Sequence, residues 1–132
     1  MTDIESTTVN EAGFSATSQV GEFNLDTHAL GESGPSPNEV LVSDYAACFT
    51  YAFRAGAQRN DFEELGKIQT DAEADLDDDD DLTGISFTMH VEAELTDDEA
   101  EELLGYAEEI CHVHAALTES LYADVTVNAG AF

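Results

Sequence analysis

Basic side chains are scarce in this sequence. Its 132 residues include only three, Arg54, Arg59 and Lys67, against 30 aspartates and glutamates, and the formal net charge is -27. Because nucleic acids and anionic membranes are bound through lysine and arginine, this composition argues against both as partners. The like charges also repel one another until salt screens them, since the Debye length falls from about 10 Å at 0.1 M to about 3 Å at 1 M ionic strength. We interpret the acidity as adaptation to a halophilic cytoplasm and not as a binding surface for a basic partner.

Long apolar runs are also missing. No stretch approaches the roughly 20 residues that a membrane-spanning helix requires. The segment from Met1 to Glu11 carries acids and threonines where a secretory signal has a basic region followed by an apolar one. We therefore expect a cytoplasmic protein. With 42% apolar residues the chain can build a modest core, and we expect a single domain over residues 1–132.

Cysteine is limited to two residues, Cys48 and Cys111. In a cytoplasmic protein, two cysteines are more often free thiols, catalytic residues or metal ligands than a structural disulfide. Cys48 follows two alanines, and a thiol among small residues is either inert packing or a protected redox centre. Both interpretations remain open at this point.

A long helix is predicted to begin at Pro37 and to end near Arg59. Ser36 is a good N-cap, Pro37 suits the first helical position, and Glu39 completes a capping box with Ser36. Apolar and small residues then recur every three or four positions, at Leu41, Tyr45, Cys48, Ala52 and Ala55. The pattern is typical of a core helix, and Cys48 lies near its middle.

Two stretches with alternating polar and apolar residues predict neighbouring strands. The alternation runs over Lys67–Leu76 and, without exception, over Ile85–Leu95, as in an antiparallel sheet with one wet face. The acidic run Asp77–Asp81 between them predicts a hairpin loop. Because this run lacks the spacing of an EF-hand calcium site, we interpret it as a solvated turn.

The remaining segments complete the expected order of elements. Weaker alternation around Gly21 suggests a short hairpin near the N-terminus, and residues 122–127 predict a final strand. A second capping box at Thr96–Glu99 begins a helix that carries Cys111 at its C-terminal end, on its buried side. The expected fold is α+β, with two main helices packed on one face of an antiparallel sheet.

Three motifs in this order carry a resemblance. They are Gly34-Pro35-Ser36-Pro37-Asn38-Glu39 at the start of the long helix, Tyr45-Ala46-Ala47-Cys48 within it, and Cys111-His112-Val113-His114-Ala115-Ala116-Leu117 after the second helix. With the strand hairpin between the helices, they resemble the OsmC/Ohr family of thiol-dependent hydroperoxide reductases. The resemblance extends from about Gly34 to Val127.

The resemblance implies an intertwined homodimer in which two long helices pack at the centre and each site is built from both subunits. It also implies that Cys48 attacks a hydroperoxide oxygen and becomes a sulfenic acid, which Cys111 resolves as a disulfide. A dithiol would then reduce that disulfide. We expect no cofactor and no metal ion.

The chain departs from the peroxidase branches of this family at the group that stabilises the thiolate. Those branches use an arginine from the segment before the helix, whereas this chain has no basic residue before Arg54. Glu39 stands nine residues before Cys48, as in the general OsmC-like branch, and we expect it to belong to the catalytic site with the two cysteines and to order that site. The possible supporting groups are therefore His112, His114 and Arg54.

Two other functions stay open. A zinc site could use Cys48, Cys111, His112 and His114, although an adjacent cysteine and histidine rarely bind one ion together. Alternatively, the chain is a non-catalytic binding or scaffold protein that keeps the fold without the arginine. Individual residues also have plainer interpretations: helix capping for Glu39, exposed loop positions for the two histidines, and carboxylate partners for the two arginines.

Overall fold

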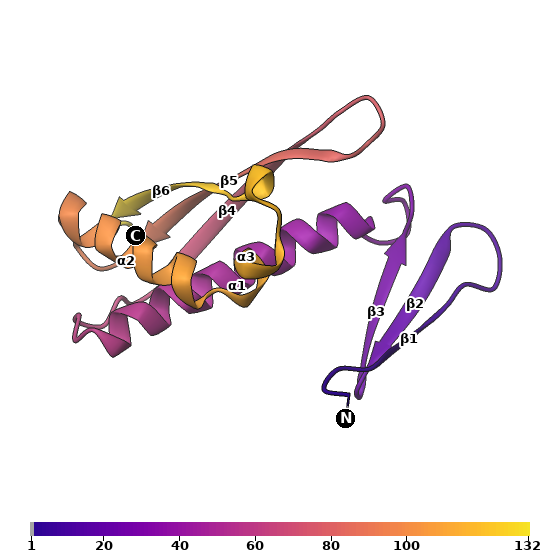
Figure 1. Ribbon diagram of the computed structural model, residues 1–132, viewed down its shortest axis with the longest axis horizontal. Coiled ribbons are helices and arrows are strands. Elements are labelled where there is room, and N and C mark those ends of the chain that lie inside the picture. The colour runs from indigo at the N-terminus through magenta and orange to yellow at the C-terminus, as the bar shows by residue number, and fades with distance from the viewer. Residues whose placement is uncertain (1) are drawn as a thin grey trace. The chain divides into compact units, whose positions relative to one another are not determined.

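The computed structural model describes residues 2–132 and confirms the α+β class (Figure 1). The elements follow in the order β1 (Ser6–Val9), β2 (Ser15–Val20), β3 (Phe23–His28), α1 (Pro37–Arg59), β4 (Ile68–Leu76), β5 (Leu82–Val91), α2 (Asp97–Ile110), α3 (His112–Ala116), the 3-10 turn η1 (Glu119–Leu121) and β6 (Asp124–Ala129). The chain contains two compact units, the first up to Leu41 and the second over Val42–Phe132. Within residues 2–132, no helix combines the length and apolar character needed to cross a membrane.

The first unit is built on an antiparallel sheet in the order β1-β2-β3. Strands β2 and β3 form the predicted hairpin, in which Val20 lies opposite Phe23. Gly21 occupies the turn with φ +60°, a conformation that suits glycine. Strand β1 was not predicted, because its sequence Ser-Thr-Thr-Val has no apolar alternation. No described residue of this unit is buried, so its sheet has no core of its own.

Helix α1 begins at Pro37 and ends at Arg59, as its sequence predicts. The capping box is confirmed, because the Ser36 hydroxyl accepts from the Glu39 N–H at 3.2 Å and the Glu39 carboxylate accepts from the Ser36 N–H at 2.9 Å. The buried residues of the helix are Tyr45, Phe49, Ala52, Phe53, Gly56 and Ala57. Of the five positions predicted for the stripe, Tyr45 and Ala52 are buried, whereas Leu41, Cys48 and Ala55 are half-buried. This face of α1 is one wall of the core of the second unit.

The second unit contains a three-stranded sheet in the order β4-β5-β6. Strands β4 and β5 pair in antiparallel fashion, as predicted, from Ile68 opposite Val91. Strand β6 differs from the prediction because it lies parallel to β5, with Ser86 opposite Asp124. A parallel neighbour requires a long crossover, and α2 and α3 supply it between β5 and β6. The second strand ends at Val91, before the predicted end at Leu95, and the chain then turns towards α2.

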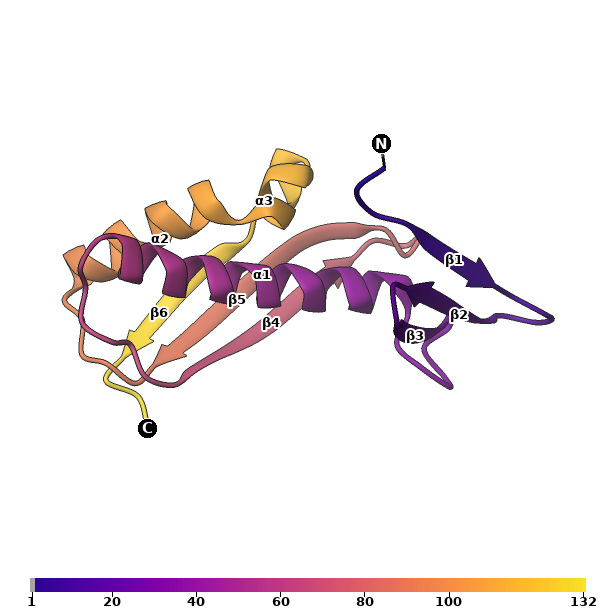
Figure 2. The ribbon, with the colours of Figure 1, turned by 90° about the horizontal axis from the view of Figure 1, so that it is seen from below.

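The core lies between this sheet and the two main helices, which cover one face of it (Figure 2). The buried residues of β5 are Ile85, Phe87, Met89 and Val91. They alternate with polar residues on the open face, where His90 contacts Asp71 at 3.0 Å and Asn128 at 3.1 Å. The two helices approach each other closely, since a Cβ on Gly56 would lie 2.7 Å from the Cβ of Tyr106. The predicted arrangement of one wet face and one face covered by helices is confirmed.

The acidic hairpin between β4 and β5 is held by hydrogen bonds within the turn itself. The Asp77 carboxylate accepts from the N–H groups of Asp79 and Asp81, at 2.9 and 3.0 Å. Every side chain from Asp77 to Asp81 is exposed. The predicted solvated turn therefore agrees with the structure.

Candidate functional site

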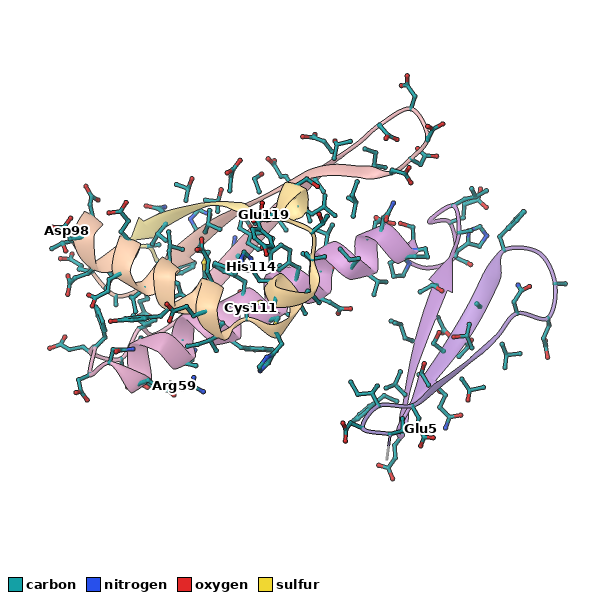
Figure 3. The ribbon with its side chains drawn as sticks, in the orientation of Figure 1. Glu5, Arg59, Asp98, Cys111, His114 and Glu119 are labelled. Carbon is teal, nitrogen blue, oxygen red and sulfur yellow. The ribbon has the colours of Figure 1, made fainter. Side chains whose placement is uncertain are left out.

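Cys48 and Cys111 come from different elements of the second unit. Cys48 lies in the middle of α1 and is half-buried, whereas Cys111 is only 1% exposed. Cys111 ends α2 with its N–H bonded to the Ala107 carbonyl at 2.9 Å, and it begins α3 with its Sγ accepting from the His114 N–H at 3.4 Å. Figure 3 shows Cys111 and His114 where α2 passes into α3. This break between two helices turns the Cys111 side chain towards α1.

The two thiols are neighbours within one chain. The side chain of Cys48 lies near enough to that of Cys111 to affect its pKa, and both cysteines are free thiols. The pKa of the Cys111 thiol is raised from its ordinary 9.0 to about 11, chiefly by burial. The neighbouring Cys48 side chain acts in the same direction, while backbone hydrogen bonds from His114 and Val113 lower the pKa. Cys111 therefore keeps its proton at neutral pH.

A buried tyrosine lies beside the thiols. Tyr45, one turn before Cys48 on α1, is 0% exposed, and its hydroxyl lies 2.7 Å from His114 Nδ1. The same oxygen accepts from the Ala123 N–H at 3.1 Å, so its own proton is available to His114. Burial raises the pKa of Tyr45, which keeps the hydroxyl protonated.

The imidazole of His114 also packs against an aromatic ring. It stacks on Tyr122 with ring centroids 3.9 Å apart and planes at 24°. His114 is therefore not an exposed loop imidazole, and that interpretation was wrong. The amphipathic pattern of α1 identified Tyr45 only as a core position. A buried tyrosine hydroxyl needs a hydrogen-bond partner, and this was the available signal for the missed contact with His114.

Comparison with known proteins identifies the family. Residues 30–126 match the model of the family described as OsmC-like protein. The chain belongs to the OsmC-like family. It is 56% identical over 132 residues to a protein of Haloferax volcanii, with 100% of each chain covered. That relative agrees with the halophilic origin predicted from the charge.

Several solved structures share the OsmC-like fold. An OsmC-like protein from Mycoplasma pneumoniae matches with a TM-score of 0.79 and 20% identity, over 97% of this chain and 96% of that one. An organic hydroperoxide resistance protein OsmC from Legionella pneumophila matches with a TM-score of 0.75 and 20% identity, over 97% and 98%. The organic hydroperoxide resistance protein OhrB of Bacillus subtilis matches with a TM-score of 0.71 and 20% identity, over 96% and 98%. At these identities the matches show the fold.

The other predicted site residues of this OsmC-like chain have different contacts. Glu39 caps α1 through the Ser36 N–H, and His112 is exposed at the first position of α3. Arg54 donates from Nη2 to the Gly66 carbonyl at 2.6 Å and so closes the turn between α1 and β4. In the described residues neither Arg54 nor Arg59 forms an ion pair, so the predicted carboxylate partners were wrong. The guanidinium of Arg54 instead donates to a turn carbonyl that has no hydrogen-bond partner in a strand.

The geometry does not support the zinc alternative. A structural zinc site needs four ligands around one point. Among residues 2–132 there is no group of three or more histidine, cysteine or acidic side chains placed to hold a metal ion. The chemistry available at this site is therefore that of a pair of thiols.

Proposed function

We propose that this OsmC-like chain is a thiol redox protein that reduces organic hydroperoxides or hydrogen peroxide by a two-cysteine mechanism. The observation that carries the proposal is the proximity of a half-buried thiol, Cys48, to a buried, protonated thiol, Cys111. Family membership supports a peroxide-related redox role. Two proteins of the same fold are named organic hydroperoxide resistance proteins.

The first step takes place at Cys48, the more accessible sulfur. Its thiolate attacks one oxygen of the hydroperoxide, and the O–O bond breaks as the S–O bond forms. The other oxygen takes a proton and leaves as an alcohol, or as water when the substrate is hydrogen peroxide. Cys48 is oxidised to a sulfenic acid and the peroxide is reduced.

Cys111 carries the second step. Its thiol loses a proton, its sulfur attacks the Cys48 sulfur, and hydroxide leaves with that proton as water. The backbone hydrogen bonds that Cys111 receives from His114 and Val113 stabilise its thiolate as it forms. The disulfide that forms between these neighbouring thiols has an S–S length of about 2.05 Å. An external dithiol then reduces the disulfide and is itself oxidised.

Peroxide consumption tests this function directly. Purified protein in molar KCl is mixed with cumene hydroperoxide and dithiothreitol, and the remaining peroxide is measured. We expect turnover above that of dithiothreitol alone, and we expect Cys48→Ser to abolish it. Asp77→Asn, in the exposed acidic turn, is the matched control and should retain the rate. A wild-type rate equal to that of dithiothreitol alone contradicts the proposal.

A second test follows the sulfenic acid intermediate and separates the roles of the two cysteines. With Cys111→Ser, the sulfenic acid on Cys48 has no resolving partner, so one equivalent of peroxide should be consumed and the product should react with dimedone. Mass spectrometry of the Cys48 peptide detects that adduct. If the wild-type chain instead carried the dimedone adduct on Cys111 and none on Cys48, the assignment of the attacking and resolving cysteines would be reversed.

The alternative is a non-catalytic OsmC-like binding or scaffold protein. One observation favours it: the guanidinium of Arg54 is occupied with the Gly66 carbonyl. A thiolate without a nearby cation forms less readily. Such a protein would lack peroxide turnover and would keep both thiols reduced when peroxide is added.

We also propose an intertwined homodimer with the α1 helices packed at its centre. The β2-β3 hairpin has Val20, Phe23 and Leu25 on one face, and they are 42%, 78% and 41% exposed. A three-stranded sheet without buried residues is not independently stable, and an apolar face of this kind marks an interface. A second copy of the chain covers it in our proposal. Light scattering after gel filtration in molar KCl should give twice the 14.2 kDa chain mass.

A further inference from the structure

Two pairs of side chains connect the same two segments in the second unit. Tyr45 and Cys48 are one turn apart on α1, and Cys111 and His114 are three residues apart at the start of α3. The thiol of Cys48 lies near that of Cys111, and the hydroxyl oxygen of Tyr45 lies 2.7 Å from Nδ1 of His114. The second pair therefore lies alongside the reactive one, and we call it the Tyr45–His114 clasp.

Both ends of the clasp are held in place. The Tyr45 ring packs edge-on against Phe87 at 4.9 Å, and its hydroxyl accepts the Ala123 N–H at 3.1 Å. His114 stacks on Tyr122, and its backbone N–H donates to Cys111 Sγ at 3.4 Å. The clasp thus connects the fixed interior of α1 to the residue that itself contacts the Cys111 sulfur.

We propose that Tyr45 is a positioning residue for the thiol pair, which holds the Cys111 sulfur against Cys48 through His114 and so favours the disulfide over the dithiol. This inference rests on the proposed two-cysteine function. In the dithiol form, only non-covalent contacts limit the motion of the turn that carries Cys111. Without the clasp the dithiol gains conformational freedom, whereas the disulfide is still held by its covalent bond. Loss of the clasp therefore shifts the equilibrium towards the dithiol.

The reduction potential of the whole protein tests the proposal. Wild type and Tyr45→Phe are equilibrated in molar KCl with mixtures of reduced and oxidised dithiothreitol, and the Cys48–Cys111 disulfide is quantified. The loss of one buried hydrogen-bonded contact should lower the equilibrium constant for disulfide formation about tenfold. That change corresponds to a potential less negative by about 30 mV. Phenylalanine keeps the ring and its packing.

Two further variants separate positioning from a general loss of stability. His114→Phe removes the other end of the clasp and keeps a ring to stack on Tyr122, so it should produce the same shift. The double variant should produce no larger shift than either single one, because both remove the same interaction. Tyr51→Phe, on the same helix but 72% exposed, is the matched control and should leave the potential unchanged. Thermal unfolding of the reduced and oxidised forms is measured beside each potential.

The outcomes distinguish this inference from the proposed function. Folded Tyr45→Phe and His114→Phe proteins with the wild-type potential overturn the positioning role, as do fully additive shifts in the double variant. If Tyr45→Phe does not fold, the half-buried His114→Phe decides alone. If the variants shift the potential but the wild-type protein does not turn over peroxide, the positioning role of the clasp stands and the proposed peroxidase function is contradicted. A chain that forms no Cys48–Cys111 disulfide overturns both.

Discussion

The proton on Cys111 links the thiol pair to the stability of the fold. Its pKa is about 11 in the folded chain and 9.0 as the ordinary value. Below pH 9 the Cys111 thiol keeps its proton in both the folded and the unfolded state, so its contribution to the free energy of unfolding is fully present. Between pH 9 and about 11 the unfolded thiol ionises while the folded one does not. The free energy of unfolding should therefore fall by at most about 1.4 kcal/mol per pH unit in that window.

This pH effect is measured by denaturant unfolding in molar KCl between pH 8 and about 11. Cys111→Ala, which has no thiol to ionise, should show a flatter profile above pH 9. Tyr45, whose pKa burial also raises, adds a loss of its own above pH 10 in both proteins. Equal slopes for wild type and Cys111→Ala over pH 9 to 10 would contradict the assignment of the raised pKa to Cys111.

Arg54 gives a second prediction for a single residue. Its guanidinium donates to the Gly66 carbonyl at 2.6 Å and is assigned here to the turn after α1, not to the thiols. Arg54→Gln should lower the free energy of unfolding by roughly 1 kcal/mol, since a charged donor is lost at a half-buried position. Peroxide turnover and its pH profile should be unchanged. A large loss of peroxide turnover in a normally folded variant would mean that Arg54 belongs to the functional site.

Single residues also mark the limit of what the sequence could predict about the site. Cys48 and Cys111 were identified because cysteine is rare here and both lie on apolar helix faces. Their proximity depends on the break between α2 and α3, which places Cys111 by its backbone at φ -66° and ψ 112°. No spacing rule predicts that break. The Tyr45–His114 clasp was missed because the helical pattern counts tyrosine as apolar and ignores its hydroxyl.

Elements were predicted best where local chemistry determines their ends. Helix α1 has a capping box at its start, and α2 has another, with Thr96 Oγ1 accepting from the Glu99 N–H at 3.1 Å. Strand β5 was predicted from the alternation over Ile85–Leu95, although the strand itself ends at Val91. The predicted antiparallel direction of β6 was wrong, because alternation is the same read in either direction and pairing depends on the crossover. Strand β1 is recognisable only by its pairing with β2.

The approach of α1 to α2 gives a prediction with a matched control. A Cβ on Gly56 would lie 2.7 Å from the Tyr106 Cβ, whereas a Cβ on Gly105 of α2 would meet nothing within 4 Å. Both glycines are inside helices, where alanine gains up to about 1 kcal/mol in helix propensity. Gly105→Ala should therefore stabilise the protein, and Gly56→Ala should destabilise it by about 1 to 2 kcal/mol because of overpacking. Denaturant midpoints in molar KCl measure both, and a stabilising Gly56→Ala contradicts the helix packing described here.

At the scale of the whole molecule, charge dominates. The net charge of -27 repels itself in low salt, and the two histidine contacts to Glu32 and Asp71 are the ion-pair contacts among the described residues. Surface pairs of this kind add little stability. We expect the free energy of unfolding to rise steeply from about 0.1 M to about 3 M KCl, as the Debye length falls below the spacing of the charges. Circular dichroism against denaturant at each salt concentration measures this.

Salt dependence also tests whether the two units fold together. The sheet of the first unit has no buried residue among those described, so it should not stay folded when the second unit unfolds. We propose a single domain. We expect the unfolding transition reported by a fluorophore on β2 to coincide with the one reported by the far-ultraviolet signal of the helices.

The exposed turn offers a matched pair of variants for the salt dependence. Replacing Asp78 and Asp79 by asparagine should lower the salt concentration needed for half-maximal stability, while Asp78→Glu with Asp79→Glu should leave it unchanged. Screening by salt acts on the sum of the charges, so an unchanged midpoint in the asparagine variant would mean that bound cations, and not general repulsion, set the requirement for salt.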